Sequence, residues 1–120
     1  MQKPLTGPRI LVVEDEFLIA MEVEDLLRAL GAEVIGPFGH LEPALGAALK
    51  EDINGAVLDA RLDGETSEEV AALLVSRGLP VLLTTGYEGE QLPPVLRQLP
   101  RLRKPFEERD LRDMLEPAYR

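Results

Sequence analysis

The chain has 120 residues, a length that suits one compact domain and is too short for two. It contains no cysteine, which excludes disulfides, thiolate catalysis and cysteine-based zinc sites and is compatible with a reducing compartment. The formal net charge of −9, from 22 acidic and 13 basic residues, argues against nonspecific nucleic-acid binding, because that binding depends on basic groups that contact phosphates.

The sequence gives no indication of a membrane segment or a second domain. Its apolar runs are far shorter than the roughly 20 residues that a membrane span needs, and residues 1–8 lack an apolar stretch of signal-peptide length. No linker, internal repeat or low-complexity segment is present. We therefore expect one cytoplasmic domain over residues 1–120, with no output domain.

The first half of the chain predicts two strands and two helices. Residues 9–14 form an apolar, β-branched run that ends in acids, as expected for a buried parallel strand. Residues 17–30 place apolar side chains at helical spacing, and Gly31 supplies the stop. Residues 32–36 predict a short second strand, and residues 41–50 predict an Ala/Leu-rich helix.

The next elements follow the same alternation. Residues 56–59 are an apolar third strand that again ends in an acid. Residues 66–69 have the pattern of a capping box, which would open a helix that Gly78 closes. Residues 80–85 predict a fourth strand with hydroxyl side chains at its end.

The last third is less regular. Residues 86–100 contain several prolines and glycines, so any helix there should be short or irregular. Residues 99–104 can hold a short fifth strand, and residues 106–116 predict a final amphipathic helix. Five strand–helix alternations predict an α/β fold, a doubly wound, five-stranded parallel sheet with helices on both faces. We expect the strands of this sheet in the flavodoxin-like order 2-1-3-4-5, which is one of the common orders of doubly wound folds.

Chemically active side chains follow the strands of this predicted sheet. In a doubly wound sheet, ligands bind outside the carboxyl ends of the strands. Three acids, two hydroxyls and one ammonium fall at those ends; in chain order they are Glu14, Asp15, Asp59, Thr84, Thr85 and Lys104. We expect them to meet at one rim.

These residue types suit phosphoryl transfer to a carboxylate. Carboxylates can hold Mg²⁺, which prefers oxygen ligands and keeps several waters. An aspartate such as Asp59 is a competent nucleophile toward phosphorus. Mg²⁺ and Lys104 can offset charge on the phosphoryl oxygens, and Thr85 can donate a hydrogen bond to one of them.

At these residues the chain resembles the response-regulator receiver family, and the likeness covers nearly its whole length. The matching pieces are residues 10–16, 56–64, 83–86 and 103–106. Each piece is weak alone, but four in order at suitable spacing are a strong signal. Thr85-Gly86-Tyr87 further resembles atypical, often single-domain receivers with a Phe-Ala-Thr-Gly-X-Tyr signature, associated with alphaproteobacterial sensory kinases.

The resemblance implies a role for each matching residue. Glu14, Asp15 and Asp59 would hold Mg²⁺ together with the backbone carbonyl of Arg61, and Asp59 would be the phosphoacceptor. Thr85 would be the switch hydroxyl, with Tyr87 as a further switch candidate. Lys104 would bind the phosphate, and the Lys104–Pro105 peptide bond would be cis.

One departure from the usual receivers affects the expected switch. They place an aromatic residue three positions before the lysine, where this chain has Arg101. We therefore expect order and disorder in residues 87–100 to carry the signal, in place of an aromatic swing coupled to the threonine.

The resemblance also implies the partners. A histidine kinase or a phosphotransfer protein would donate the phosphoryl group, and a downstream protein that the sequence does not identify would read the changed conformation. We expect no direct nucleic-acid binding and no dedicated enzymatic activity beyond self-catalysed phosphorylation and dephosphorylation. A homodimer through the face between the fourth helix and the fifth strand is an open alternative.

Two other functions compete with the receiver. The chain could be a degenerate receiver that acts only as a protein-binding module, although the intact acids, Thr85 and Lys104 speak against that. It could also be a phosphohydrolase of the haloacid-dehalogenase type, but that chemistry wants an acid two residues after the nucleophile, where Arg61 stands. Taken alone, Asp59 could simply cap a turn. Asp63 is expected in a turn with Gly64, and His40 in a cap or exposed.

Overall fold

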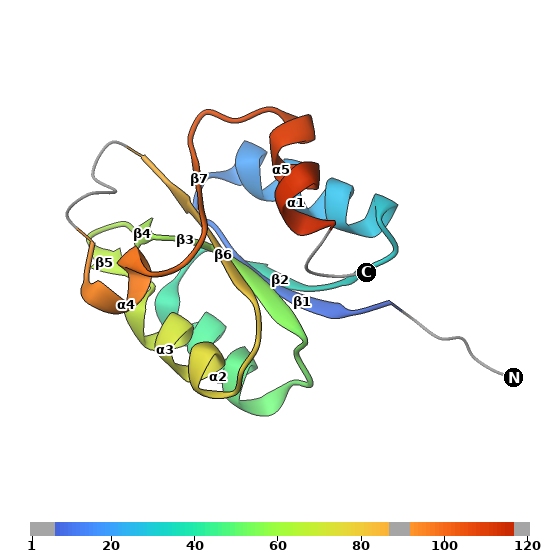
Figure 1. The fold of residues 1–120 in the computed structure, drawn as a ribbon. Coiled ribbons are helices and arrows are strands. Elements are labelled where there is room, and N and C mark those ends of the chain that lie inside the picture. The colour runs from blue at the N-terminus through green and yellow to red at the C-terminus, as the bar shows by residue number, and fades with distance from the viewer. Residues whose placement is uncertain (1–6, 87–91, 117–120) are drawn as a thin grey trace, which may run out of the picture.

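The protein is described by a computed structural model in which residues 7–86 and 92–116 are placed. Strands and helices alternate along the chain (Figure 1). The elements are β1 (Arg9–Val13), α1 (Phe17–Ala29), β2 (Glu33–Phe38), α2 (Leu41–Lys50), β3 (Gly55–Asp59), β4 (Arg61–Leu62), β5 (Glu65–Thr66), α3 (Glu68–Ser76), β6 (Val81–Thr85), α4 (Pro94–Arg97), β7 (Arg101–Arg103) and α5 (Glu108–Leu115).

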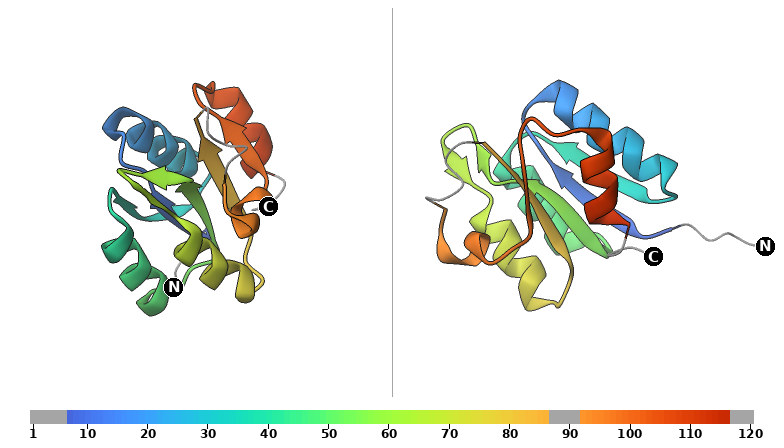
Figure 2. Two further views of the ribbon diagram at one scale, coloured as in Figure 1. Left: turned by 90° about the vertical axis from the view of Figure 1, so that its left-hand side faces the viewer. Right: turned by 45° about the horizontal axis from the view of Figure 1, so that its top comes forward.

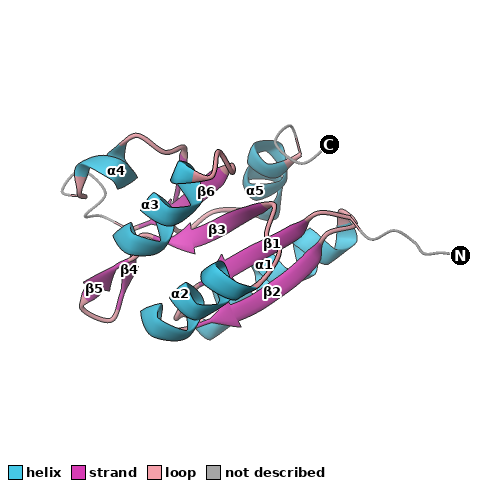
Figure 3. Ribbon diagram, turned by 90° about the horizontal axis from the view of Figure 1, so that it is seen from below, coloured by secondary structure: helices cyan, strands magenta, loops and turns pink. Residues whose placement is uncertain are grey.

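Five parallel strands form the main sheet in the order β2-β1-β3-β6-β7. Counted among the parallel strands alone, this is the predicted order 2-1-3-4-5, so the flavodoxin-like fold is confirmed. The short strands β4 and β5 pair separately as an antiparallel hairpin that follows β3 (Figure 3). Its two-residue turn is Asp63-Gly64, both with positive φ, as predicted for that pair.

Helices cover both faces of the sheet (Figures 1 and 2). α1 and α5 lie over one face, and α2, α3 and α4 lie over the other. Alternate residues of one strand feed the two cores: Ile10 and Val12 pack with α1 and α5, whereas Leu11 and Val13 pack with α2 and α3. All residues of β3 and β6 are buried, which explains why these strands are apolar without alternation.

The predicted helix stops are confirmed at two glycines. Gly31 and Gly78 follow the last turns of α1 and α3 with φ of 93° and 74°, a left-handed conformation that glycine adopts without a Cβ penalty. The predicted bounds of α2 are confirmed, and His40 precedes this helix as an exposed residue without a side-chain cap. The strand predicted over residues 32–36 extends to Phe38 and contains a cis Gly36–Pro37 bond.

The predicted capping box at residues 66–69 is wrong. Ser67 is the N-cap of α3, but its φ and ψ of −87° and 20° are not extended, and its side chain makes no capping bond. Its hydroxyl instead points into the interior without a hydrogen-bond partner. A reciprocal capping box is found at α5, where Glu107 and Asp110 bond to each other's backbone.

The region before the last strand is irregular, as predicted. Its helix α4 has only four residues, Pro94–Arg97, with proline at its start. The Lys104–Pro105 bond is cis, as the family resemblance implied. Across the two described ranges, no helix is long and apolar enough to cross a membrane.

Candidate functional site

Parallel pairing brings the predicted site residues together at one edge of the sheet. β1 and β3 are neighbours, with Val13 opposite Leu58, so Glu14 and Asp59 follow side by side. Asp59 lies opposite Thr84 on β6. The backbone N–H of Lys104 donates to the carbonyl oxygen of Thr85 at 2.6 Å, which places Lys104 beside the end of β6.

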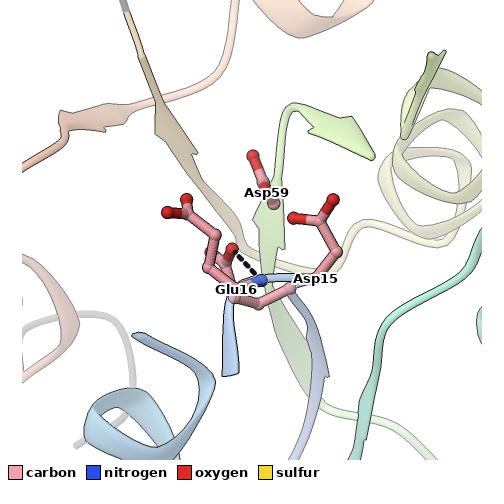
Figure 4. Close-up of side chains that lie close together, drawn as sticks. Asp15, Glu16 and Asp59 are labelled. Carbon is pink, nitrogen blue, oxygen red and sulfur yellow. Dashed lines mark hydrogen bonds between the residues drawn. The ribbon is translucent and has the colours of Figure 1, made fainter. Parts of the chain in front are cut away.

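Four carboxylates gather at this edge. Glu14, Asp15, Glu16 and Asp59 each offer one oxygen, and these atoms lie within 4.8 Å of one another. In Figure 4 the carboxyl groups of Asp15 and Glu16 rise from the loop after β1 on either side of Asp59. Glu16 was not among the predicted site residues. Its signal in the sequence was its place as the third consecutive acid after a buried strand.

Lys104 lies among these acids and contacts three of them. Its Nζ atom is 3.0 Å from Oε2 of Glu14, 2.7 Å from Oε1 of Glu16 and 3.1 Å from Oδ2 of Asp59. The Lys104 side chain is largely buried, with 13% of it exposed. The sequence prediction that Lys104 joins Glu14 and Asp59 is therefore confirmed as a matter of geometry.

Glu14 is the most enclosed of the acids and is held by several donors. Its Oε2 accepts a hydrogen bond from the backbone N–H of Glu16 at 3.0 Å, in addition to the contact with Lys104. Its Oε1 accepts from the hydroxyl of Thr84 at 3.4 Å. Thr84, at the end of β6, thus forms a hydrogen bond within the site.

Burial and neighbouring charge act on Asp59 in the same direction. Desolvation by burial, together with the charge of Glu14, raises the pKa of Asp59 to about 8, and the ammonium of Lys104 only partly offsets this. For Lys104, burial lowers the pKa, but the hydrogen bonds to Glu16 and Glu14 and the charge of Asp59 outweigh burial and raise it. The ionised form of Asp59 is therefore disfavoured unless further positive charge binds beside it.

The remaining predicted residues are placed as follows. The backbone N–H of Arg61 donates to Oδ1 of Asp59 at 3.3 Å, and its side chain is exposed. Thr85 is buried at the end of β6. Tyr87, the second switch candidate, lies outside the described residues. Arg101, which stands where the usual receivers have an aromatic residue, is exposed and begins β7.

The donor set fits a hard divalent cation. Carboxylate oxygens are the ligands that such cations prefer, and the four acids converge on one point. Burial and the charge of Glu14 raise the pKa of Asp59 despite the nearby Lys104 ammonium, so a cation bound here would favour the ionised carboxylate. Fold and site together define a doubly wound α/β domain with an acidic, cation-compatible site around one buried aspartate.

Comparisons with known proteins identify the family. The chain is similar to SdrG from Sphingomonas melonis Fr1, with 34% identity, a TM-score of 0.81, and coverage of 96% of this chain and 98% of that one. It is also similar to the signal receiver domain of a modulated diguanylate cyclase from Desulfovibrio desulfuricans G20, with 30% identity, a TM-score of 0.77 and 93% coverage of each chain. The chain therefore belongs to the response-regulator receiver domain family.

A more distant solved structure agrees in fold. The receiver domain of the sensor histidine kinase PA1611 from Pseudomonas aeruginosa PAO1, solved with a magnesium ion in its active-site cleft, shares the fold at 22% identity and a TM-score of 0.77, covering 93% of this chain and 97% of that one. No protein-family model matches the chain.

Two curated relatives are longer than this chain. PhyR of Methylorubrum extorquens is 32% identical over 117 residues, which are 91% of this chain and 42% of PhyR. PdtaR, a transcriptional regulatory protein of Mycobacterium tuberculosis, is 27% identical over 114 residues, which are 92% of this chain and 56% of PdtaR. The chain thus spans about half the length of these relatives.

Proposed function

We propose that this receiver domain is a phosphorylation switch in which Asp59 accepts a phosphoryl group from a histidine kinase or a phosphotransfer protein. The observation that carries the proposal is the contact between Lys104 and Asp59 at 3.1 Å beside Glu14. It joins a nucleophilic carboxylate at the end of β3, a cation that follows β7 and a further acid that follows β1, all at one edge of the sheet. This combination is what phosphoryl transfer to a carboxylate requires.

The covalent step exchanges one bond to phosphorus for another. A carboxylate oxygen of Asp59 attacks the phosphorus of a phosphohistidine, the P–N bond breaks, and the imidazole nitrogen keeps the electron pair. Glu14, Asp15, Asp59 and the carbonyl of Arg61 would hold Mg²⁺. When bound, Mg²⁺ supplies positive charge that favours the ionised carboxylate and offsets charge on the phosphoryl oxygens.

The chain's own residues then position the product. Lys104 pairs with one phosphoryl oxygen, because its ammonium already contacts Asp59. The Thr85 hydroxyl donates a hydrogen bond to another oxygen. Residues 86–100 follow Thr85 directly in the chain, and residues 87–91 among them lie outside the described residues. We propose that this segment changes conformation on phosphorylation and is read by a downstream protein.

An exposed apolar surface beside the site supports docking of a donor protein. Phe17 and Leu18 begin α1, immediately after the acidic loop, and their exposed fractions are 73% and 74%. Met21 lies one turn further along the helix and is also exposed. Exposed apolar side chains gathered in one place commonly mark protein–protein contacts.

The type of receiver and its mode of output belong to the same proposal. The similarity to SdrG and PhyR supports the atypical Phe-Ala-Thr-Gly-X-Tyr type, which Thr85-Gly86-Tyr87 also suggested. We propose that the domain acts in the cytoplasm by controlling a protein partner and does not contact nucleic acid, in keeping with its charge of −9. It serves as phosphoacceptor and is not a dedicated enzyme.

The two competing functions find less support in the site. A phosphohydrolase of the haloacid-dehalogenase type needs an acid where Arg61 presents an exposed side chain. A degenerate binding module would not need Lys104 and three further acids around the buried Asp59.

Intact-mass measurement after incubation with acetyl phosphate is the direct test. We expect the wild type to gain the mass of one phosphate in the presence of Mg²⁺, and the Asp59→Asn variant to gain none. A gain that persists in the variant would place the acceptor elsewhere. If neither acetyl phosphate nor a panel of phosphorylated histidine kinases gives a gain, and Mg²⁺ does not bind, the binding-module function replaces this one.

A further inference from the structure

All three N–H donors of the Lys104 ammonium are engaged. An ammonium group carries three donors and accepts nothing. Nζ of Lys104 donates to Glu14 at 3.0 Å, to Glu16 at 2.7 Å and to Asp59 at 3.1 Å. A phosphoryl oxygen at Asp59 can bind this ammonium only if one of the three contacts opens.

The three carboxylates differ in what their release costs. The side chain of Glu14 is 3% exposed, so losing the ammonium would leave its carboxylate buried without a cation. Asp59 becomes an acyl phosphate, and its phosphoryl oxygens keep negative charge beside Lys104, so the ammonium stays at that end of the site. The side chain of Glu16 is 59% exposed. Water can hydrate its carboxylate as soon as the contact opens, so Glu16 is the partner that Lys104 can leave most easily.

The backbone of Glu16 is anchored although its side chain is exposed. Its N–H donates to Oε2 of Glu14 at 3.0 Å, and its carbonyl oxygen accepts from the N–H of Ala20 at 2.9 Å as α1 begins. The carboxylate of Glu16 is therefore presented to Lys104 from a fixed position. It can swing away without disturbing the strand or the helix.

We propose that Glu16 is a positioning residue that holds Lys104 in the unphosphorylated protein and hands it over to the phosphoryl group on Asp59. This inference rests on the proposed function. The handover changes no covalent bond: the ammonium leaves a solvent-exposed carboxylate for a phosphoryl oxygen. Glu16 thereby competes with the phosphoryl group for Lys104, and it weakens phosphoryl binding by the strength of its own ion pair.

The first measurement follows Lys104 directly in the metal-free protein. The chain has only three lysines, Lys3, Lys50 and Lys104, so their ¹⁵N side-chain signals can be assigned with single substitutions. We expect Glu16→Gln to speed hydrogen exchange of the Lys104 ammonium with water by roughly two- to fivefold, the range for an ion pair with one exposed partner. The signals of the other two lysines should not change.

The second measurement uses beryllofluoride, a mimic of a phosphoryl group on aspartate. In the presence of Mg²⁺, Glu16→Gln should tighten beryllofluoride binding by roughly two- to fivefold. Glu16→Asp keeps the charge but is one methylene shorter, so it should tighten binding as well. Glu65→Gln is the matched control, because Glu65 is an exposed acid on the hairpin after β3 and does not contact Lys104.

Two outcomes would overturn this inference alone. Lys104 exchange could be unchanged in Glu16→Gln, which would mean that Glu16 does not hold the ammonium. Alternatively, Glu65→Gln could tighten beryllofluoride binding as much as Glu16→Gln, with Glu16→Asp like wild type, which would mean that only net charge matters. A wild type that binds neither beryllofluoride nor a phosphoryl group would overturn the proposed function and the handover together.

Discussion

Asp59 lies in an environment that disfavours the ionised form of its side chain. It lies in a buried position next to Glu14, and its pKa rises to about 8 through desolvation and that neighbouring charge. Between the ordinary carboxyl pKa and about 8, the folded metal-free protein retains a proton that the unfolded chain has released. The stability that this proton contributes is therefore lost as the pH rises through that window.

The raised pKa of Asp59 predicts how the stability gained by Asp59→Asn depends on pH. In metal-free buffer, Asp59→Asn should be more stable than the wild type, by a margin that grows as the pH rises from about 4 to about 8. Thermal unfolding of both proteins across that range measures the margin, in which titrations that the two proteins share cancel. A margin independent of pH would show that Asp59 does not retain its proton in the folded state.

Ser67 stands at the N-cap position of α3, but its hydroxyl is buried and does not cap the helix. The residue is fully buried, and the hydroxyl has no hydrogen-bond partner. Ser67→Ala should therefore raise the free energy of unfolding by about 1 kcal/mol, because a buried unsatisfied hydroxyl costs about that much. Chemical denaturation measures the change. A loss of stability would indicate that the hydroxyl has a partner in solution.

At the scale of elements, the functional edge of the sheet is formed by short strands, none of which carries the site by itself. β3 and β6 are short buried strands, and each delivers its functional residue only because its last position lies at the carboxyl edge. β7 has three residues, yet its pairing with β6 sets where Lys104 emerges. α5 follows this strand and packs against α1.

The start of α5 offers a test of how its capping stabilises the helix. Glu107 and Asp110 form a reciprocal capping box, so Glu107→Ala should cost about 1 kcal/mol and speed amide exchange in the first turns of α5. Asp113→Asn, at an exposed position nearer the end of α5, should leave exchange in those first turns unchanged. Equal effects from the two substitutions would mean that the box does not stabilise the helix.

At the scale of the whole molecule, the charge of −9 and the clustered acids make the domain sensitive to cations. The four carboxylates of the site, Asp59 among them, repel one another in the folded state when ionised, and the single ammonium of Lys104 offsets only part of that repulsion. A divalent cation that binds the folded state and not the unfolded chain stabilises the fold in proportion to its occupancy.

Removing or adding the cation should therefore shift the melting temperature. At Mg²⁺ concentrations about 100 times the dissociation constant, we expect about 2.7 kcal/mol of added stability, reversed by a chelator. Asp15→Asn should abolish most of this gain, whereas Glu69→Gln, an exposed acid on α3, should retain it. Equal gains in both variants would indicate general screening and not a site.

The amino-acid sequence and the tertiary structure determine different features of this protein. Periodicity and glycine stops determined the alternation of strands and helices, and the strand-end residues predicted that Glu14, Asp59 and Lys104 would meet. They do so because hydrophobic patterns are local and the carboxyl ends of parallel strands must share one edge. Only the tertiary structure decided that Glu16 pairs with Lys104 and that Ser67 is buried without a partner. Those outcomes depend on contacts and exposure across distant segments, which local patterns do not encode.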